Sequence, residues 1–169
     1  LLKGPTITRG YYNRDELTRQ AFTDDGYFRT GDSGYLEGGE LFLKERIKDL
    51  FKTSNGKYIA PQMIESKILV DKYVDQIAII ADQRKFVSAL IIPVYSLLEE
   101  YAHKHDIPFG SREDLCQNQQ IHEMMMERID TLQQQLAHYE QIKRFTLLPH
   151  AFSMERGELT NTLKIKRRV

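Results

Sequence analysis

Residues 45–61 read Glu-Arg-Ile-Lys-Asp-Leu-Phe-Lys-Thr-Ser-Asn-Gly-Lys-Tyr-Ile-Ala-Pro, a basic, hairpin-like stretch between two regions of different composition. Cations alternate with apolar residues in its first half. If the stretch is extended, Arg46, Lys48 and Lys52 share one face and the apolar side chains share the other. Lysines are also common on solvated strand edges, so the pattern alone favours an exposed cationic edge over a binding surface. The flanking regions decide between the two.

The composition bounds the class of protein. A chain of 169 residues suits one domain, or one domain plus a flap, with a core of useful size. Lys and Arg total 24, as do Asp and Glu, and this neutral balance argues against a dedicated nucleic-acid binder. The single cysteine, Cys116, excludes an internal disulfide and a cysteine metal cage, which fits a reducing cytosol. The first residues do not resemble a signal peptide, no apolar run is long enough to span a membrane, and both ends read as cuts in a longer chain.

The first 45 residues are rich in turn signals and poor in long apolar runs. We expect a short helix over 14–21, capped by Asn13, and a β-hairpin across 36–43 around two glycines. Such a segment can hardly build a core alone. It should therefore belong to a neighbouring domain or to the face of this one.

Residues 27–32 of this region read Tyr-Phe-Arg-Thr-Gly-Asp. A carboxylate at Asp32 could accept two hydrogen bonds at once, which suits the vicinal hydroxyls of a ribose, and Gly31 would let a ligand approach the backbone closely. Without further context, a plain turn is the simpler interpretation.

The region after residue 60 alternates between helical and strand patterns. We expect a helix over 61–71, strands over 76–81 and 87–94, a helix over 96–105, a long amphipathic helix carrying Ile121, Met125, Ile129, Leu132 and Leu136, and a strand over 145–148. Ser96 and Ser111 resemble N-caps of the helix over 96–105 and of the long helix. The methionines at 124–126 could form a partner-binding surface, but core packing is the simpler interpretation. The fold class is therefore α+β: a small mixed sheet of about three strands covered by helices, preceded by a β-rich segment and hairpin.

The common catalytic signatures are missing from the sequence. The five histidines lack metal-ligand spacing, and there is no Gly-x-Ser-x-Gly elbow and no catalytic Cys/His pairing. There is also no glycine-rich phosphate loop, so most of the grip on any nucleotide phosphate must lie elsewhere. Near the C-terminus, Lys164 stands between hydroxyl residues and a basic tail. It could be part of a charged terminus, or the mobile ammonium of a reaction that develops negative charge on a phosphate or carboxylate.

Three segments together resemble the adenylate-forming enzymes, the superfamily of acyl-CoA synthetases, peptide-synthetase adenylation domains and beetle luciferases. Residues 27–32 resemble the Tyr-x-x-Thr-Gly-Asp motif of that superfamily, residues 45–56 its hinge motif, and residues 160–167 its terminal lysine motif. Within the superfamily the chain is most similar to the C-terminal domain of long-chain fatty acyl-CoA synthetases. That narrower resemblance rests on residues 49–52, 56–61 and 159–167.

The resemblance implies a role for individual residues. Asp32 would hold the ribose hydroxyls of ATP and of the acyl-adenylate, and Arg46 would place a cation near the same ribose. Lys48 would be the hinge about which the small domain rotates between two half-reactions. Lys164 would be the catalytic lysine of adenylate formation. After rotation, the loop around Gly56 would replace it and help to form the channel for the pantetheine arm of CoA.

The resemblance also implies an organisation and a set of ligands. Residues 1–45 would be the tail of a large N-terminal adenylation domain, and residues 46–169 a small, mobile C-terminal lid domain. Fatty acid, ATP and CoA would be the substrates, AMP would be released, and Mg²⁺ would accompany ATP, held mainly by the large domain. We expect the chain's partner to be its own N-terminal domain, with no nucleic acid, and a cytoplasmic location with peripheral attachment to the inner face of a membrane. The fragment alone should be inactive.

Two positions depart from the family pattern, and two other functions stay open. Leu163 replaces the glycine that commonly precedes the terminal lysine, and Asn161 replaces a proline frequent in the long-chain variant. The chain lacks an acyl pocket, so it could belong to a ligase for another carboxylate. A stand-alone anion-binding or interaction module, using the basic residues of 44–57 and 164–168, is the third hypothesis, and the neutral net charge argues against it.

Overall fold

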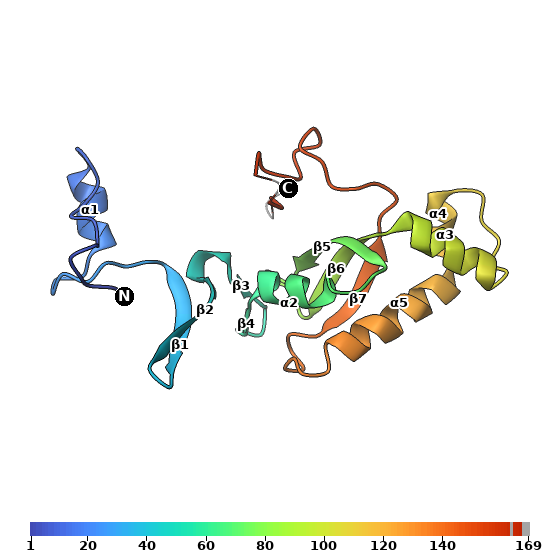
Figure 1. The fold of residues 1–169 in the computed structure, drawn as a ribbon, viewed down its shortest axis with the longest axis horizontal. Coiled ribbons are helices and arrows are strands. Elements are labelled where there is room, and N and C mark those ends of the chain that lie inside the picture. Colours follow the sequence, from blue (N-terminus) through green and yellow to red (C-terminus); the bar gives the residue numbers. More distant parts are fainter. Residues whose placement is uncertain (163, 167–169) are drawn as a thin grey trace. The chain divides into compact units, whose positions relative to one another are not determined.

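The computed structural model describes residues 1–162 and 164–166, with Lys44 described by its backbone alone. The chain divides into two compact units, Leu1–Asp49 and Leu50–Val169, each coloured along the sequence in Figure 1. The sequence places a domain boundary after residue 45, whereas the compact units divide after Asp49. The predicted C-terminal motif residue Leu163 and the last three residues of the basic tail lie outside the described residues.

The first unit contains one helix and one hairpin. Its elements are α1 (Asp15–Ala21), β1 (Asp32–Glu37), β2 (Glu40–Arg46) and the 3-10 helix η1 (Ile47–Asp49). Strands β1 and β2 pair antiparallel, which confirms the predicted hairpin and extends it at both strand ends. The predicted cap of α1 is wrong: Arg14 is the N-cap residue and makes no side-chain cap bond, while Asn13 has a positive φ of 50°. Asn13 therefore lies in the turn before α1 and does not cap the first amides of the helix.

The first unit has no hydrophobic core of its own. Among the residues described up to Asp49, only Glu45 is buried. Tyr35 and Phe42 stack on each other across the hairpin, with ring centroids 5.2 Å apart, yet both stay exposed. This agrees with the expectation that such a segment cannot build a core alone.

The second unit is a three-stranded sheet with helices. Its elements are β3 (Phe51–Lys52), β4 (Tyr58–Ile59), α2 (Pro61–Ile68), β5 (Val74–Ile80), β6 (Val87–Pro93), α3 (Tyr95–Lys104), α4 (Arg112–Gln117), α5 (Gln119–Leu132) and β7 (Ile142–Leu147). The sheet has the order β5-β6-β7, with β5 antiparallel and β7 parallel to β6. The α+β class with a small mixed sheet is thus confirmed (Figure 1).

The core of this unit comes from the periodic apolar positions. Helix α2 buries Ile64 and Ile68, and α5 buries Ile121, Met125 and Ile129, each at helical spacing. The interpretation of the methionines as core is confirmed for Met125, which is 1% exposed. Both β5 and β6 bury most of their side chains, as their isoleucine and valine content predicts.

Several helix boundaries differ from the prediction: α2 ends at Ile68 instead of residue 71, and α5 ends at Leu132, before the predicted Leu136. Helix α3 starts one residue early, at Tyr95, and Val94 is its N-cap, so the predicted Ser96 cap is wrong. The Tyr95 hydroxyl donates to the Leu148 carbonyl at 2.7 Å, and this buried tertiary contact fixes the helix start. The predicted long helix is instead two, α4 and α5, because Asn118 is extended and its side chain caps α5.

Candidate functional site

Asp32 and Arg46 come together across the hairpin of the first unit. They are register partners in β1 and β2, and the Arg46 Nε lies 3.6 Å from the Asp32 Oδ1. Their side chains are 34% and 60% exposed, respectively. An ion pair this open to water contributes little to stability, so both groups stay available to a ligand. The structure therefore brings together the two residues that the sequence predicted at a ribose.

The turn before Asp32 fixes its backbone. Gly31 has a φ of +75°, a setting that costs other residues energy, and its carbonyl accepts a hydrogen bond from the Ile47 amide at 2.8 Å. The Asp32 amide donates to the Thr30 hydroxyl at 3.1 Å. These bonds leave the Asp32 carboxylate at a turn closed by the start of η1.

Lys48 lies in η1, at the division between the two compact units, and is exposed. The condition for a shared cationic face, an extended stretch over 46–52, is not met, because the 3-10 helix η1 interrupts it. Arg46 ends a strand, and Lys52 belongs to the separate hairpin β3–β4. The alternation of cations and apolar residues therefore serves two elements instead of one.

Gly56 lies at the tip of the β3–β4 hairpin. Its φ is +77°, its amide donates to the Thr53 carbonyl at 2.9 Å, and no atom lies within 4 Å of where a Cβ would stand. A glycine is needed there for the backbone conformation, and the open space around it lets a ligand approach the turn. This geometry suits the predicted role of the Gly56 loop beside a substrate channel.

The β3–β4 hairpin is fastened to the turn between β5 and β6. The Gln83 amide donates to the Lys52 carbonyl at 2.9 Å, and the Ser54 amide donates to the Arg84 carbonyl at 3.0 Å. Arg84 thereby joins Lys52 and Lys57 around the Gly56 turn, all three exposed. Sequence reasoning treated residues 82–85 as a plain polar turn and missed Arg84. No local signal could have found it, since only the fold brings it beside residues thirty positions earlier.

Lys164 follows a tight loop near the C-terminus. Leu159 and Ile165 form an antiparallel bridge, the Thr160 amide donates to the Lys164 carbonyl at 2.8 Å, and the Lys164 amide donates to the Thr160 hydroxyl at 3.0 Å. The Lys164 side chain is exposed and pairs with no carboxylate of a described residue.

A second layer of bonds holds the base of this loop. The Lys166 amide donates to the Glu158 carbonyl at 2.8 Å. The Arg156 guanidinium beside Glu158 and the Ser153 amide that donates to it hold the pKa of the Glu158 carboxyl below its usual range. Arg156 also donates to the carbonyl of Ala151. A small cluster of charge-assisted hydrogen bonds therefore anchors the base of the lysine loop.

The second unit matches a known protein family. The model of the AMP-binding enzyme C-terminal domain matches residues 48–169, well over half of the chain. The chain belongs to the AMP-binding enzyme C-terminal domain family. The match includes Gly56 and Lys164 and begins at Lys48, the predicted hinge.

Relatives of this AMP-binding enzyme C-terminal domain include long-chain ligases. Long-chain-fatty-acid–CoA ligase 1 of Schizosaccharomyces pombe is 36% identical over 173 residues, which cover 99% of this chain and 26% of that protein. The peroxisomal long chain acyl-CoA synthetase 7 of Arabidopsis thaliana is 36% identical over 98% of this chain and 24% of its own length. The chain thus spans about a quarter of the relatives it matches.

Solved structures give the same family. The adenylation domain of a carboxylate reductase from Mycobacterium chelonae superposes with a TM-score of 0.74 at 25% identity, over 98% of this chain and 24% of that one. The A domain of the carboxylic acid reductase from Segniliparus rugosus, solved with AMP and a co-purified carboxylic acid, gives a TM-score of 0.73 at 25% identity. The AMP-binding enzyme C-terminal domain is therefore like adenylating domains in fold as well as in sequence.

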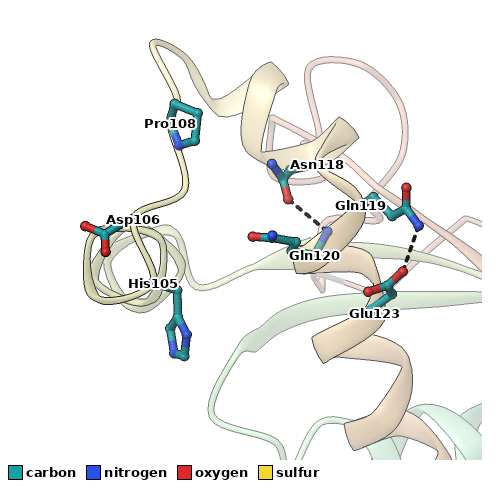
Figure 2. Close-up of a pocket in the computed structure, with 7 residues that line it drawn as sticks. All are labelled: His105, Asp106, Pro108, Asn118, Gln119, Gln120 and Glu123. Carbon is teal, nitrogen blue, oxygen red and sulfur yellow. Dashed lines mark hydrogen bonds between the residues drawn. The ribbon is translucent and has the colours of Figure 1, made fainter.

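One cavity of the second unit has none of the predicted site residues in its lining. It is open, holds about 540 Å³, and is lined by His105, Asp106, Pro108, Asn118, Gln119, Gln120 and Glu123 (Figure 2). Figure 2 shows that Asn118 is engaged in capping α5 and that Gln119 donates to Glu123, at 2.8 Å. In the described part of the chain, no metal-binding group of three His, Cys, Asp or Glu side chains occurs, and no helix is long and apolar enough to cross a membrane.

Proposed function

We propose that this chain is the C-terminal part of an ATP-dependent long-chain fatty acid:CoA ligase. In the first half-reaction the fatty carboxylate attacks the α-phosphate of ATP, forming acyl-adenylate and pyrophosphate. In the second, the CoA thiol displaces AMP to give the thioester. The observation that carries this proposal is the 36% identity to a long-chain ligase along 99% of the chain. We also infer a cytoplasmic location, with fatty acid taken up from the inner face of a membrane.

In adenylate formation, we assign the positive charge of Lys164 to the reacting centre. Charge builds on the carboxylate and phosphate oxygens as the new bond forms, and an exposed ammonium can neutralise it. Asp32 would accept hydrogen bonds from both ribose hydroxyls, and Arg46, 3.6 Å away, would face the same nucleotide. Mg²⁺ would enter with ATP and be held mainly by the large domain.

In thioester formation, we assign the Gly56 turn to the CoA channel. CoA carries several phosphate charges, and Lys52, Lys57 and Arg84 are exposed cations around this turn. Lys48 would be the pivot that exchanges the two arrangements, because it lies in the short η1 turn where one compact unit ends. This exchange would withdraw Lys164 from the site once the adenylate has formed.

The test of the proposal separates the two half-reactions in the full-length protein. Lys164→Ala should lower adenylate formation by about 10²- to 10³-fold, measured as pyrophosphate release. Acyl-CoA formation from supplied acyl-adenylate should stay close to that of the wild type. Lys164→Arg, which keeps the charge but changes its shape, is the matched control and should lose less. Equal loss of both half-reactions would contradict the role of Lys164.

A ligase or activating domain for another carboxylate is the second candidate. It is favoured by the likeness, at 25% identity, to a carboxylic acid reductase domain solved with AMP and a carboxylic acid. Turnover of the full-length protein across fatty acids of increasing length, with an aryl acid beside them, separates the two. A maximum at long chains supports the fatty acid ligase, and a maximum at short or aryl acids supports the second candidate.

A further inference from the structure

Two loops of the second unit close in the same way. In each, a threonine and the lysine four residues later exchange two hydrogen bonds. The Thr53 amide donates to the Lys57 carbonyl at 2.9 Å, and the Lys57 amide donates to the Thr53 hydroxyl at 3.1 Å. The Thr160 amide donates to the Lys164 carbonyl at 2.8 Å, and the Lys164 amide donates to the Thr160 hydroxyl at 3.0 Å. We call these the CoA-side loop (53–57) and the lysine loop (160–164).

The threonine hydroxyl makes a second hydrogen bond to the backbone of the lysine. It accepts the amide hydrogen of the lysine, while the threonine amide binds that lysine's carbonyl, so both polar groups of the lysine's backbone are fixed. The direction of a side chain follows from its backbone. Each threonine therefore sets where its loop presents the lysine, without touching a ligand itself.

The same closure in the first unit shows that it is a local structural device of this chain. Thr23 and Tyr27 exchange the same two bonds, at 2.8 and 2.9 Å. In that loop and in the CoA-side loop, the residue before the last is a glycine at positive φ, Gly26 or Gly56. In the lysine loop that position is Leu163, outside the described residues. The two lysine-bearing loops coincide with the two segments that the proposed function uses in turn.

We propose that Thr53 and Thr160 are matched positioning residues, one for each half-reaction. Thr160 holds the lysine loop in the shape that adenylate formation needs, and Thr53 holds the CoA-side loop in the shape that thioester formation needs. This inference rests on the proposed function of Lys164 and of the Gly56 turn.

The two loops differ in their other supports, which sets the expected size of the effects. Thr53 is 5% exposed, its hydroxyl also donates to the Lys57 carbonyl at 3.2 Å, and the neighbouring Ser54 amide is bonded to the β5–β6 turn. Thr160 is less buried, and its hydroxyl has Thr162 as a neighbour at 3.0 Å. The lysine loop thus depends more on its threonine than the CoA-side loop does.

The experiment measures both half-reactions in the full-length protein, with one variant expected to impair each. Thr160→Val should lower the kcat of adenylate formation by about 10- to 100-fold, with little change in the KM for ATP, because the lysine is misplaced rather than lost. Thioester formation from supplied acyl-adenylate should be unchanged. Thr53→Val should lower thioester formation, by a smaller factor, and leave adenylate formation unchanged. Thr160→Ser and Thr53→Ser keep the hydroxyl and should restore each activity.

The half-reaction that a variant keeps reports that the variant has folded. Thr131→Val is the matched control, because its hydroxyl donates to the Glu127 carbonyl within α5 and makes none of the bonds that close either loop, so both half-reactions should be unchanged. Equal loss of both half-reactions in either loop variant, or wild-type rates in both valine variants, would overturn the inference. If Lys164→Ala leaves adenylate formation intact, the proposed function itself fails. If Lys164→Ala is defective but Thr160→Val is normal, only this inference fails.

Discussion

Asp32 and Arg46 hold opposite charges side by side at the surface of the first unit, and neither is committed to a structural role. In Asp32→Ala the ribose would lose a charge-assisted acceptor for two hydroxyls. We expect the KM for ATP to rise by about 10²- to 10⁴-fold, since two such bonds of about 1.5–3 kcal/mol each are lost. Steady-state adenylation across ATP concentrations measures this. Asp32→Asn keeps one acceptor, so its KM for ATP should lie between those of the wild type and Asp32→Ala. An unchanged KM in Asp32→Ala would argue against ribose binding.

Glu158 makes the base of the lysine loop sensitive to acid. Arg156, followed by the Ser153 amide, lowers its pKa from the usual 4.5. A carboxyl whose pKa is depressed by folding stabilises the folded form above its unfolded pKa, and this contribution is lost as the pH falls through the folded pKa. Exchange of the Ser153 amide should therefore accelerate as the pH falls from 4.5 through the lowered pKa of Glu158, beyond the intrinsic pH dependence. Glu158→Gln should abolish that acid-induced step, and a step that persists in this variant would contradict the assignment.

The site residues that the sequence predicts share one property. Asp32, Gly56 and Lys164 each belong to a motif that is contiguous along the chain. Arg84 was missed because its place beside the Gly56 turn depends on hydrogen bonds between segments distant in sequence. Thr160 belongs to the predicted lysine motif, but its bond to the Lys164 amide depends on the loop's closed shape and could not be read from the sequence.

The element at the boundary of the two units is the short turn η1. A pivot needs a residue that takes two backbone settings, and proline at that residue would fix φ near −65°. Lys48→Pro in the full-length protein should spare adenylate formation and block thioester formation. Lys48→Ala removes the same side chain without fixing the backbone, and it should spare both. Unimpaired thioester formation in Lys48→Pro would refute the hinge.

Helix α4 tests how a cap is recognised. Ser111 and Asp114 exchange side-chain and backbone hydrogen bonds in a full capping box, whereas Ser96 lies inside the first turn of α3 and caps nothing. Ser111→Ala should destabilise the chain by about 1 kcal/mol, and Ser96→Ala by less than about 0.5 kcal/mol. Denaturant unfolding of both variants measures the difference. Equal losses would mean that the cap contributes nothing beyond helix propensity.

The same comparison shows what sequence patterns could say about elements. Both serines have an acidic residue three positions later, so the local signal was equal. Ser96 is not the cap because α3 begins one residue earlier, at Tyr95, which is buried and bonded to Leu148. The strands were predicted well because isoleucine and valine runs are specific to buried sheet. The break at Asn118 was not predicted, although the four polar residues 117–120 interrupt the apolar positions there.

At the scale of the whole molecule, long-range polar bonds assemble the second unit. Gln133 is 2% exposed and clamps Ile142, accepting from its amide at 2.7 Å and donating to its carbonyl at 3.2 Å. The Arg128 Nε lies 2.7 Å from the Asp71 Oδ2, which ties α5 to the loop before β5. None of these pairs could be read from the sequence, because their partners lie on different elements.

The order of strands has a consequence for how this molecule folds. Strand β6 meets β5 through a short hairpin turn, but it meets β7 only after three helices have intervened. Closing that long loop is slow, and until it closes one edge of β6 offers unpaired backbone groups to other chains. In pulsed hydrogen exchange during refolding, β5 and β6 amides should gain protection before those of β7, and simultaneous protection would contradict this order. The half-folded chain, with its central strand open on one side, is then the species most prone to aggregate, and a ribosome would present it each time the chain is made.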